Sequence, residues 1–293
     1  MDIISLSVAS TIDSILNFPL VLDVVIVLFL LISTSFGFAK GFWRGLWRFI
    51  FVIIMLVISW FFIVEPMAKW IMDDMFSLFK ITAVVGDANF TSLGDYLKEV
   101  IRLGVETGKL SSKYASEAYV NGLILSLCKS VAWLFLVAII QFVSWIISSL
   151  FYVLLIRLII PKKVRAVKIK LLGALLGLMQ GVVIVFAFMS SFATLSPAIG
   201  EISGNNPAFS WISPYVVSIF KGFNPENSNI LRPYVNTIEE NFTEKLIGFE
   251  VDGNVYNGSL EIKEFFSLTN TFADETPSET AWNSLDFDTS ICE

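Results

Sequence analysis

Four long apolar runs constrain the fold more than any other feature of this chain. Each has about 20 residues or more, and a helix of that length rises about 30 Å, the thickness of a bilayer's hydrocarbon core. The composition agrees, because 55% of the 293 residues are hydrophobic and only 16% are charged. We therefore predict an all-α, polytopic membrane protein with four transmembrane helices. The expected spans are residues 20–39, 46–64, 131–160 and 171–195.

Basic residues gather in the two short turns between these spans, and neither turn contains an acid. The first turn holds Lys40, Arg44 and Arg48, and the second holds Lys162, Lys163, Arg165, Lys168 and Lys170. Because positive charge is retained on the cytoplasmic side, both turns are predicted to be cytoplasmic and both termini extracytoplasmic. These bases are expected to anchor the topology, and they are also candidates for binding anionic headgroups or a cytoplasmic partner.

The remaining chain is predicted to lie outside the membrane. Residues 1–195 form the four-helix transmembrane domain, with residues 65–120 as an extracytoplasmic loop containing two amphipathic interfacial helices. The second of these has Ser92 as its expected N-cap. Residues 196–293 carry 15 acids and 4 bases. We expect an acidic extracytoplasmic region with short helices at 211–220 and 231–246, disordered from about residue 267, and no nucleic-acid binding.

The sequence offers no residues for catalysis or for a metal site. The chain has no histidine, which removes the commonest general base and metal ligand. Its two cysteines, Cys128 and Cys292, belong to no metal-spacing motif and are predicted to be free thiols. No cofactor-binding motif is present either. We therefore expect a protein that is not an enzyme and that binds no cofactor.

Two glycine triplets, each with a four-residue period, lie at the ends of the first and fourth spans that share one membrane leaflet. Positions four apart lie on one face of a helix, so each triplet makes a groove that lets another helix approach closely. We expect the two grooves to pack together, within one subunit or between subunits. A second interpretation is a moving joint or a constriction lined by bare backbone. The glycines are Gly37, Gly41, Gly45, Gly173, Gly177 and Gly181.

Two polar side chains interrupt the apolar runs. Asp23 stands near the outer edge of the first span, where we expect it to reach water or to cap the helix. An alternative role for Asp23 is an intramembrane ion or proton site. Gln141 lies deep in the third span, and its expected role is a hydrogen bond between helices.

Two segments of the chain resemble the signatures of the colicin V production protein (CvpA) family. The first is Leu22-Asp23 followed by Gly-Phe-Ala-Lys-Gly-Phe-Trp-Arg at 37–44, and the second is the glycine-rich stretch 170–181. The resemblance covers about residues 20–195. Ile169, Gln180 and Gly45 stand where relatives usually carry Asp, Arg and Glu. The acidic extension from about residue 225 has no expected counterpart.

The resemblance implies a four-span protein of the bacterial plasma membrane, linked to bacteriocin production or export and to envelope integrity. We expect a non-catalytic scaffold or secretion accessory that self-associates through the glycine grooves and contacts secretion or envelope membrane proteins. The alternative is a small oligomeric channel or transporter, with Asp23 and the glycine crossing on its path.

Overall fold

Among the residues that the structure describes, four helices are long and apolar enough to cross a membrane. The computed structural model describes residues 19–78, 83–85, 88–108, 110–151, 170–200 and 214–274. The first span is α2 (Pro19–Lys40), and the second is α3 (Phe42–Ile58), which continues through a π-helical turn into α4 (Val64–Leu78). The third and fourth are α6 (Glu117–Phe151) and α9 (Lys170–Gly200). The prediction of a helical protein with four helices able to span a membrane is confirmed, although the described residues also include two short β-hairpins.

The helix of the second span continues past residue 64, where the predicted span ends. The π turn η1 (Ser59–Ile63) precedes α4, and the Val64 N–H bonds to the Ser59 carbonyl five residues back. Pro66 then falls in the first turn of α4, where a residue without an N–H is tolerated. The stretch expected to form the first interfacial helix is therefore the end of the same continuous helix.

The third helix begins at Glu117, fourteen residues before the predicted start of its span at Val131. Lys129 sets a limit for burial in lipid but not for helix formation, so the helix runs through it. Residues before Lys129 pack inside the protein, among them Tyr119, Leu123 and Ile124. Residues 152–169 lie outside the described part of the chain, so the predicted end of this span is untested.

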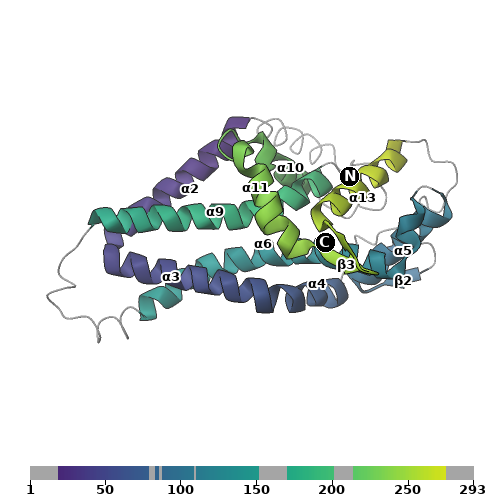
Figure 1. Ribbon diagram of the computed structural model, residues 1–293, viewed down its shortest axis with the longest axis horizontal. Coiled ribbons are helices and arrows are strands. Elements are labelled where there is room, and N and C mark those ends of the chain that lie inside the picture. Colours follow the sequence, from purple (N-terminus) through teal and green to yellow (C-terminus); the bar gives the residue numbers. More distant parts are fainter. Residues whose placement is uncertain are drawn as a thin grey trace, which may run out of the picture.

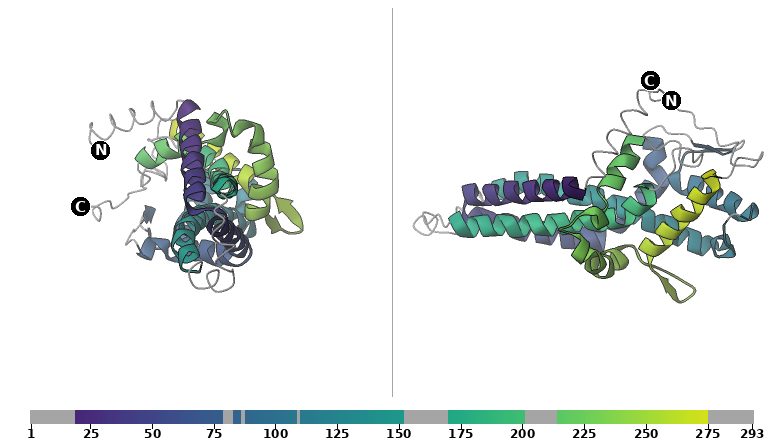
Figure 2. Two further views of the ribbon diagram at one scale, coloured as in Figure 1. Left: turned by 90° about the vertical axis from the view of Figure 1, so that its left-hand side faces the viewer. Right: turned by 90° about the horizontal axis from the view of Figure 1, so that it is seen from above.

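The molecule has a long helical bundle at one end and a compact head at the other (Figure 1). We define the head as residues 64–120 and 214–274. At the end of the bundle away from the head, the C-termini of α2 and α6 lie beside the N-termini of α3 and α9. Figure 2 shows the bundle and the head from two further directions. Besides α4 and the start of α6, the head contains β1 (Ala83–Val85), β2 (Ala88–Phe90), α5 (Leu93–Glu106), η2 (Ser112–Ala115), α10 (Pro214–Gly222), η5 (Pro225–Asn227), η6 (Arg232–Tyr234), α11 (Val235–Ile238), η7 (Glu239–Thr243), α12 (Glu244–Ile247), β3 (Phe249–Val251), β4 (Asn254–Tyr256) and α13 (Gly258–Asp274).

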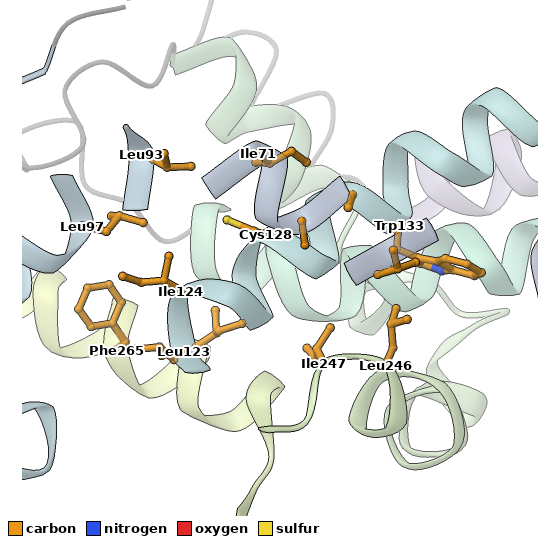
Figure 3. Close-up of a cluster of buried hydrophobic side chains, with 14 of the residues drawn as sticks. Ile71, Leu93, Leu97, Leu123, Ile124, Cys128, Trp133, Leu246, Ile247 and Phe265 are labelled. Atoms are coloured by element: carbon orange, nitrogen blue, oxygen red, sulfur yellow. The ribbon is translucent and has the colours of Figure 1, made fainter. Parts of the chain in front are cut away.

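One hydrophobic core joins the head to the bundle. It extends from Val52 of α3 and Val137 of α6 to Tyr96 of α5 and Phe265 of α13. Figure 3 shows the part of this core where the head meets α6, with labelled side chains from α4, α5, α6, α12 and α13. The described part of the acidic region, residues 214–274, is therefore packed against the long apolar helices and does not stand apart as a tail.

Helix α13 continues to Asp274, so the prediction of disorder from about residue 267 is wrong for residues 267–274. Its buried residues Ile262, Phe265 and Phe266 recur at helical spacing and fix it to the core. Residues 275–293 lie outside the described part of the chain. The expected helix at 231–246 is broken into η6, α11, η7 and α12, while α10 begins at Pro214 within the other predicted helix.

Two local features of the head follow from its sequence. The Ser92 hydroxyl accepts a hydrogen bond from the Asp95 N–H at 3.3 Å, which confirms Ser92 as the N-cap of α5. The short hairpin β3–β4 was not predicted, although its Asp252-Gly253 turn is a strong hairpin signal. Both turn residues have positive φ, at 52° and 79°.

Candidate functional site

The glycine triplets meet each other where α2 crosses α9. A Cβ placed on Gly173 would lie 2.5 Å from the Gly37 carbonyl oxygen and 2.8 Å from the Gly41 carbonyl carbon. A Cβ on Gly37 would lie 2.9 Å from the Gly177 Cα. These separations are shorter than a real Cβ atom can occupy, so the two backbones are in direct contact. The Ser33 hydroxyl donates to the Gly177 carbonyl at 2.6 Å and strengthens the crossing.

The other glycines at this end have different roles. Gly41 alone joins α2 to α3 and adopts φ of +76°, a conformation that favours glycine. A Cβ on Gly181 would meet Leu30 and Ser33 side chains at 3.0 and 3.1 Å, whereas one on Gly45 would make ordinary contacts with Leu176 at 3.6 Å. The two grooves face each other within one chain, so this surface is already occupied and does not remain free for a second copy.

Asp23 anchors the head to the start of α2. Its Oδ1 accepts hydrogen bonds from the Ser228 hydroxyl at 2.5 Å and the Ile230 N–H at 3.3 Å. Its Oδ2 accepts from the Asn229 backbone N–H and side-chain amide, both at 3.1 Å. The residue is only 9% exposed. We call this set of four bonds the Asp23 anchor.

The expectation that Asp23 reaches water or caps α2 is therefore wrong, because both carboxylate oxygens are occupied by the segment 228–230. Four donors from one short segment compensate a buried carboxylate that would otherwise be costly. Sequence reasoning missed this partner because 205 residues separate Asp23 from Ser228. The polar, turn-forming composition around 224–230 signalled a loop and gave no indication of its target.

Gln141 of α6 lies opposite Gln180 of α9. The Gln180 amide donates to the Gln141 side-chain oxygen at 3.4 Å, and Gln180 is 3% exposed. This is the kind of interhelical contact expected for Gln141. It also places a neutral amide pair where an arginine is common in the family that the sequence resembles. Gln141 contributes to the wall of an apolar cavity of about 240 Å³ between α2, α6 and α9, which Ile26, Phe29, Val137 and Ile184 also line.

The described basic residues of the two predicted turns lie at the glycine end of the bundle. The Lys40 Nζ lies 5.8 Å from the Phe36 ring centre and 5.9 Å from that of Trp145, and the Lys170 Nζ lies 5.4 Å from the Phe38 ring centre. Such distances permit cation–π attraction. Arg44 is exposed, while the Nε of half-buried Arg48 has no hydrogen-bond acceptor among the described residues. Lys162, Lys163, Arg165 and Lys168 lie outside the described residues.

A second polar cluster, which sequence reasoning missed, fastens α13 within the head. The Lys113 ammonium donates to Glu264 at 2.7 Å and to Glu261 at 2.9 Å, and the Tyr119 hydroxyl also donates to Glu261. Partial burial acts to lower the pKa of Lys113, but the bonds to Glu264 and Glu261 outweigh it and raise that pKa. Burial also raises the pKa of neighbouring Tyr114 to about 12.

Within the described ranges, no group of three or more His, Cys, Asp or Glu residues is arranged to hold a metal ion. Cys128 is a buried free thiol, and Cys292 lies outside those ranges. No protein-family model matches the chain, and neither a curated protein nor a solved structure matches it.

Proposed function

We propose that this chain is a CvpA-like integral membrane protein that supports bacteriocin production or export, or envelope homeostasis, as a non-catalytic scaffold or secretion accessory. The observation that carries the proposal is that the helices and the head are held together by direct contacts within one chain. The glycine crossing brings two backbones into contact, and the Asp23 anchor ties the bundle to the head. Such a unit is suited to present two fixed surfaces on opposite sides of a membrane.

The orientation belongs to the same proposal. The bases of the α2–α3 turn and Lys170 stand at one end of the bundle, opposite the head. The positive-inside effect then favours a plasma membrane protein with its glycine end in the cytoplasm, and with the head and both termini outside. Single cysteines at Arg165 and Ser112, introduced after replacing Cys128 and Cys292, test this with a membrane-impermeant thiol reagent. Labelling of position 165 in intact cells would contradict the orientation.

A small oligomeric channel or transporter is the second candidate. One observation favours it, because the amide of Gln141 lies in the wall of a cavity between three membrane helices. Two observations oppose it: the remaining lining of that cavity is apolar, and both oxygens of Asp23 are already bonded to the head.

Flux measurements separate the two candidates. We expect purified full-length protein in liposomes to pass ions and small solutes no faster than empty vesicles do, with a pore-forming peptide as the positive control. Flux that rises with the amount of folded protein would overturn the scaffold proposal. A variant such as Gly177→Leu is unsuitable here, because its side chain would collide with the backbone of α2 and disturb the fold itself.

Partner capture tests the scaffold directly. Lys162→Ala combined with Lys163→Ala removes two of the five bases in the turn and leaves three to hold the topology. We expect this double variant to lose cross-links to secretion or envelope membrane proteins in host membranes, and to lower bacteriocin release. Lys69→Ala with Lys98→Ala in the head is the matched control. An equal loss of cross-links in the two double variants would contradict a specific role for the turn. Self-association is assessed in the same samples.

A further inference from the structure

A second, larger groove lies between α3, α6 and α9 and has no role in the function proposed above. Its volume is about 880 Å³, within the range typical of ligand sites. On the second span it is lined at positions 53, 56 and 57 of α3 and at positions 60 and 61 of η1, which follow one another on a single helical face. On α9 the lining comes from positions 182, 183, 186 and 187. This face lies within helices that are apolar enough to cross the membrane.

Two tryptophans form a rigid part of the wall. The rings of Trp60 and Trp133 pack edge to face, with centres 5.5 Å apart and planes at 84°. The indole N–H of Trp133 donates to the Ala187 carbonyl at 2.9 Å and to the Ser190 hydroxyl at 3.0 Å. Its polar atom is thus satisfied within the protein, and the ring presents hydrocarbon to the groove. Trp60 and Phe61 stand on the π turn, a feature frequent at functional sites.

The one charged side chain in the lining is Lys245 of α12, which belongs to the head. Lys245 is exposed and makes no hydrogen bond or ion pair with any described residue. The neighbouring acid, Glu244, is instead bonded to the Asn257 amide. A cation that has no partner among the residues the structure describes therefore stands where the apolar groove meets the head.

Buried hydrogen bonds on either side hold Lys245 in this place. Two residues before it, the Thr243 hydroxyl donates to the Ser190 carbonyl of α9 at 3.3 Å. Two residues after it, the Ile247 carbonyl accepts from the Ser126 hydroxyl of α6 at 2.6 Å. The chain on both sides of Lys245 is thus fixed to two of the helices that form the groove, so the fold places the base of this side chain at the groove.

We propose that this groove binds an acyl chain of an anionic membrane phospholipid, whose phosphate pairs with Lys245. From residue 53 to residue 61, the continuous helix of α3 and η1 rises about 12 Å, close to the thickness of one leaflet's hydrocarbon layer. The apolar walls match the acyl chain, and the lone cation matches the charge of the headgroup. Zwitterionic phospholipid offers the same chain but no net charge, so headgroup preference distinguishes this site from general solvation by lipid.

Native mass spectrometry of the detergent-solubilised full-length protein tests the site. The protein is titrated with phosphatidylglycerol or with phosphatidylcholine of identical acyl chains. We expect one site that prefers phosphatidylglycerol by about fivefold, the contribution typical of one lysine at a membrane surface. Lys245→Gln should abolish the preference, while Lys245→Arg and the head control Lys98→Gln should retain it. Equal binding of the two lipids, or an unchanged preference in Lys245→Gln, would overturn the proposal.

Filling the groove provides an independent readout. Val57 lines the groove and is 50% exposed, so Val57→Trp adds bulk without disturbing the core. We expect Val57→Trp to lower binding of both lipids at this site by tenfold or more, and Val27→Trp, at a 43% exposed position of α2 outside the groove, to leave it unchanged. A photoreactive residue at position 57 should cross-link lipid. Cross-linking to a second copy or to another protein would assign the groove to that occupant and refute the lipid site.

Discussion

The Asp23 anchor makes a sharp prediction for the substitution Asp23→Asn. The side chain keeps its size but exchanges one acceptor oxygen for an amide that can only donate. If the remaining oxygen keeps two of the four donors, the other two face a donor instead of an acceptor. Each hydrogen bond to a charged group contributes about 1.5–3 kcal/mol. We therefore expect the segment 228–231 to detach from α2 more easily by about 3 kcal/mol.

Thiol labelling measures this opening directly. Val235, 7% exposed at the start of α11, becomes the reporter Val235→Cys after Cys128 and Cys292 are replaced. When opening is fast relative to labelling, the labelling rate follows the population of the open form. A change of about 3 kcal/mol then accelerates labelling roughly 100-fold, since each 1.4 kcal/mol is a factor of ten.

The matched control is Asp74→Asn, which makes the same chemical change at an exposed position of α4. Its labelling rate should equal that of the parent carrying the same reporter. Ser228→Ala, which removes one donor to Asp23, should fall between the control and Asp23→Asn. If Asp23→Asn labels within twofold of the parent, the anchor does not hold the head, and the reasoning from its four hydrogen bonds is refuted.

Three further predictions concern other contacts. Gly177→Ala should destabilise the folded protein by about 2 kcal/mol, because its Cβ would overlap the α2 backbone. Gly45→Ala should be neutral or slightly stabilising, because its Cβ makes only ordinary contacts. Thermal inactivation in detergent compares the two variants, and equal midpoints would contradict this account of the packing. Gln180→Leu should cost about 0.6 kcal/mol by removing the Gln141 bond, measured in the same assay, and a stabilised variant would show that this bond contributes nothing. The raised pKa of Lys113 means that its contribution to stability is complete below about pH 10.4 and is lost as the pH rises through the folded-state pKa. The difference in thermal midpoint between native protein and Lys113→Met should therefore be constant near neutral pH and become smaller in strong alkali. A difference that grew in strong alkali would contradict the upward direction of the pKa shift of Lys113.

Much of the bundle could be predicted from the sequence, because the signals for its helices lie within short stretches of the chain. Hydrophobic length marks the four spans, and the four-residue period of Gly37 and Gly177 indicates a close helix crossing. The side-chain oxygen of Ser92 similarly marks the start of α5. Each of these signals lies within a single helix and requires no knowledge of its partner.

The head could not be predicted in the same way, because its contacts join distant parts of the chain. The bond from Ser228 to Asp23 and the bonds from Lys113 to α13 each span more than 140 residues. The last residues of α13 stand in a polar, acidic setting, so composition favoured disorder from about residue 267, although the helix secured by buried Phe265 continues to Asp274. In α6 the start of the helix also differs from the predicted start of the membrane span, because residues before Lys129 are helical and are buried by other parts of the protein.

The two-part construction of the head has a consequence for how the protein is made. Residues 64–120 are synthesised long before residues 214–274, whose side chains complete their core. Until the last span has been inserted and the chain after it has followed, apolar positions such as Leu97 and Ile101 lack their late partners, Ile262 and Phe265 of α13. During synthesis the incomplete head exposes apolar surface that is prone to aggregation, as is typical of folding intermediates. A ribosome that stalls after α9 would leave a membrane-inserted product that is a natural target for chaperones and quality-control proteases.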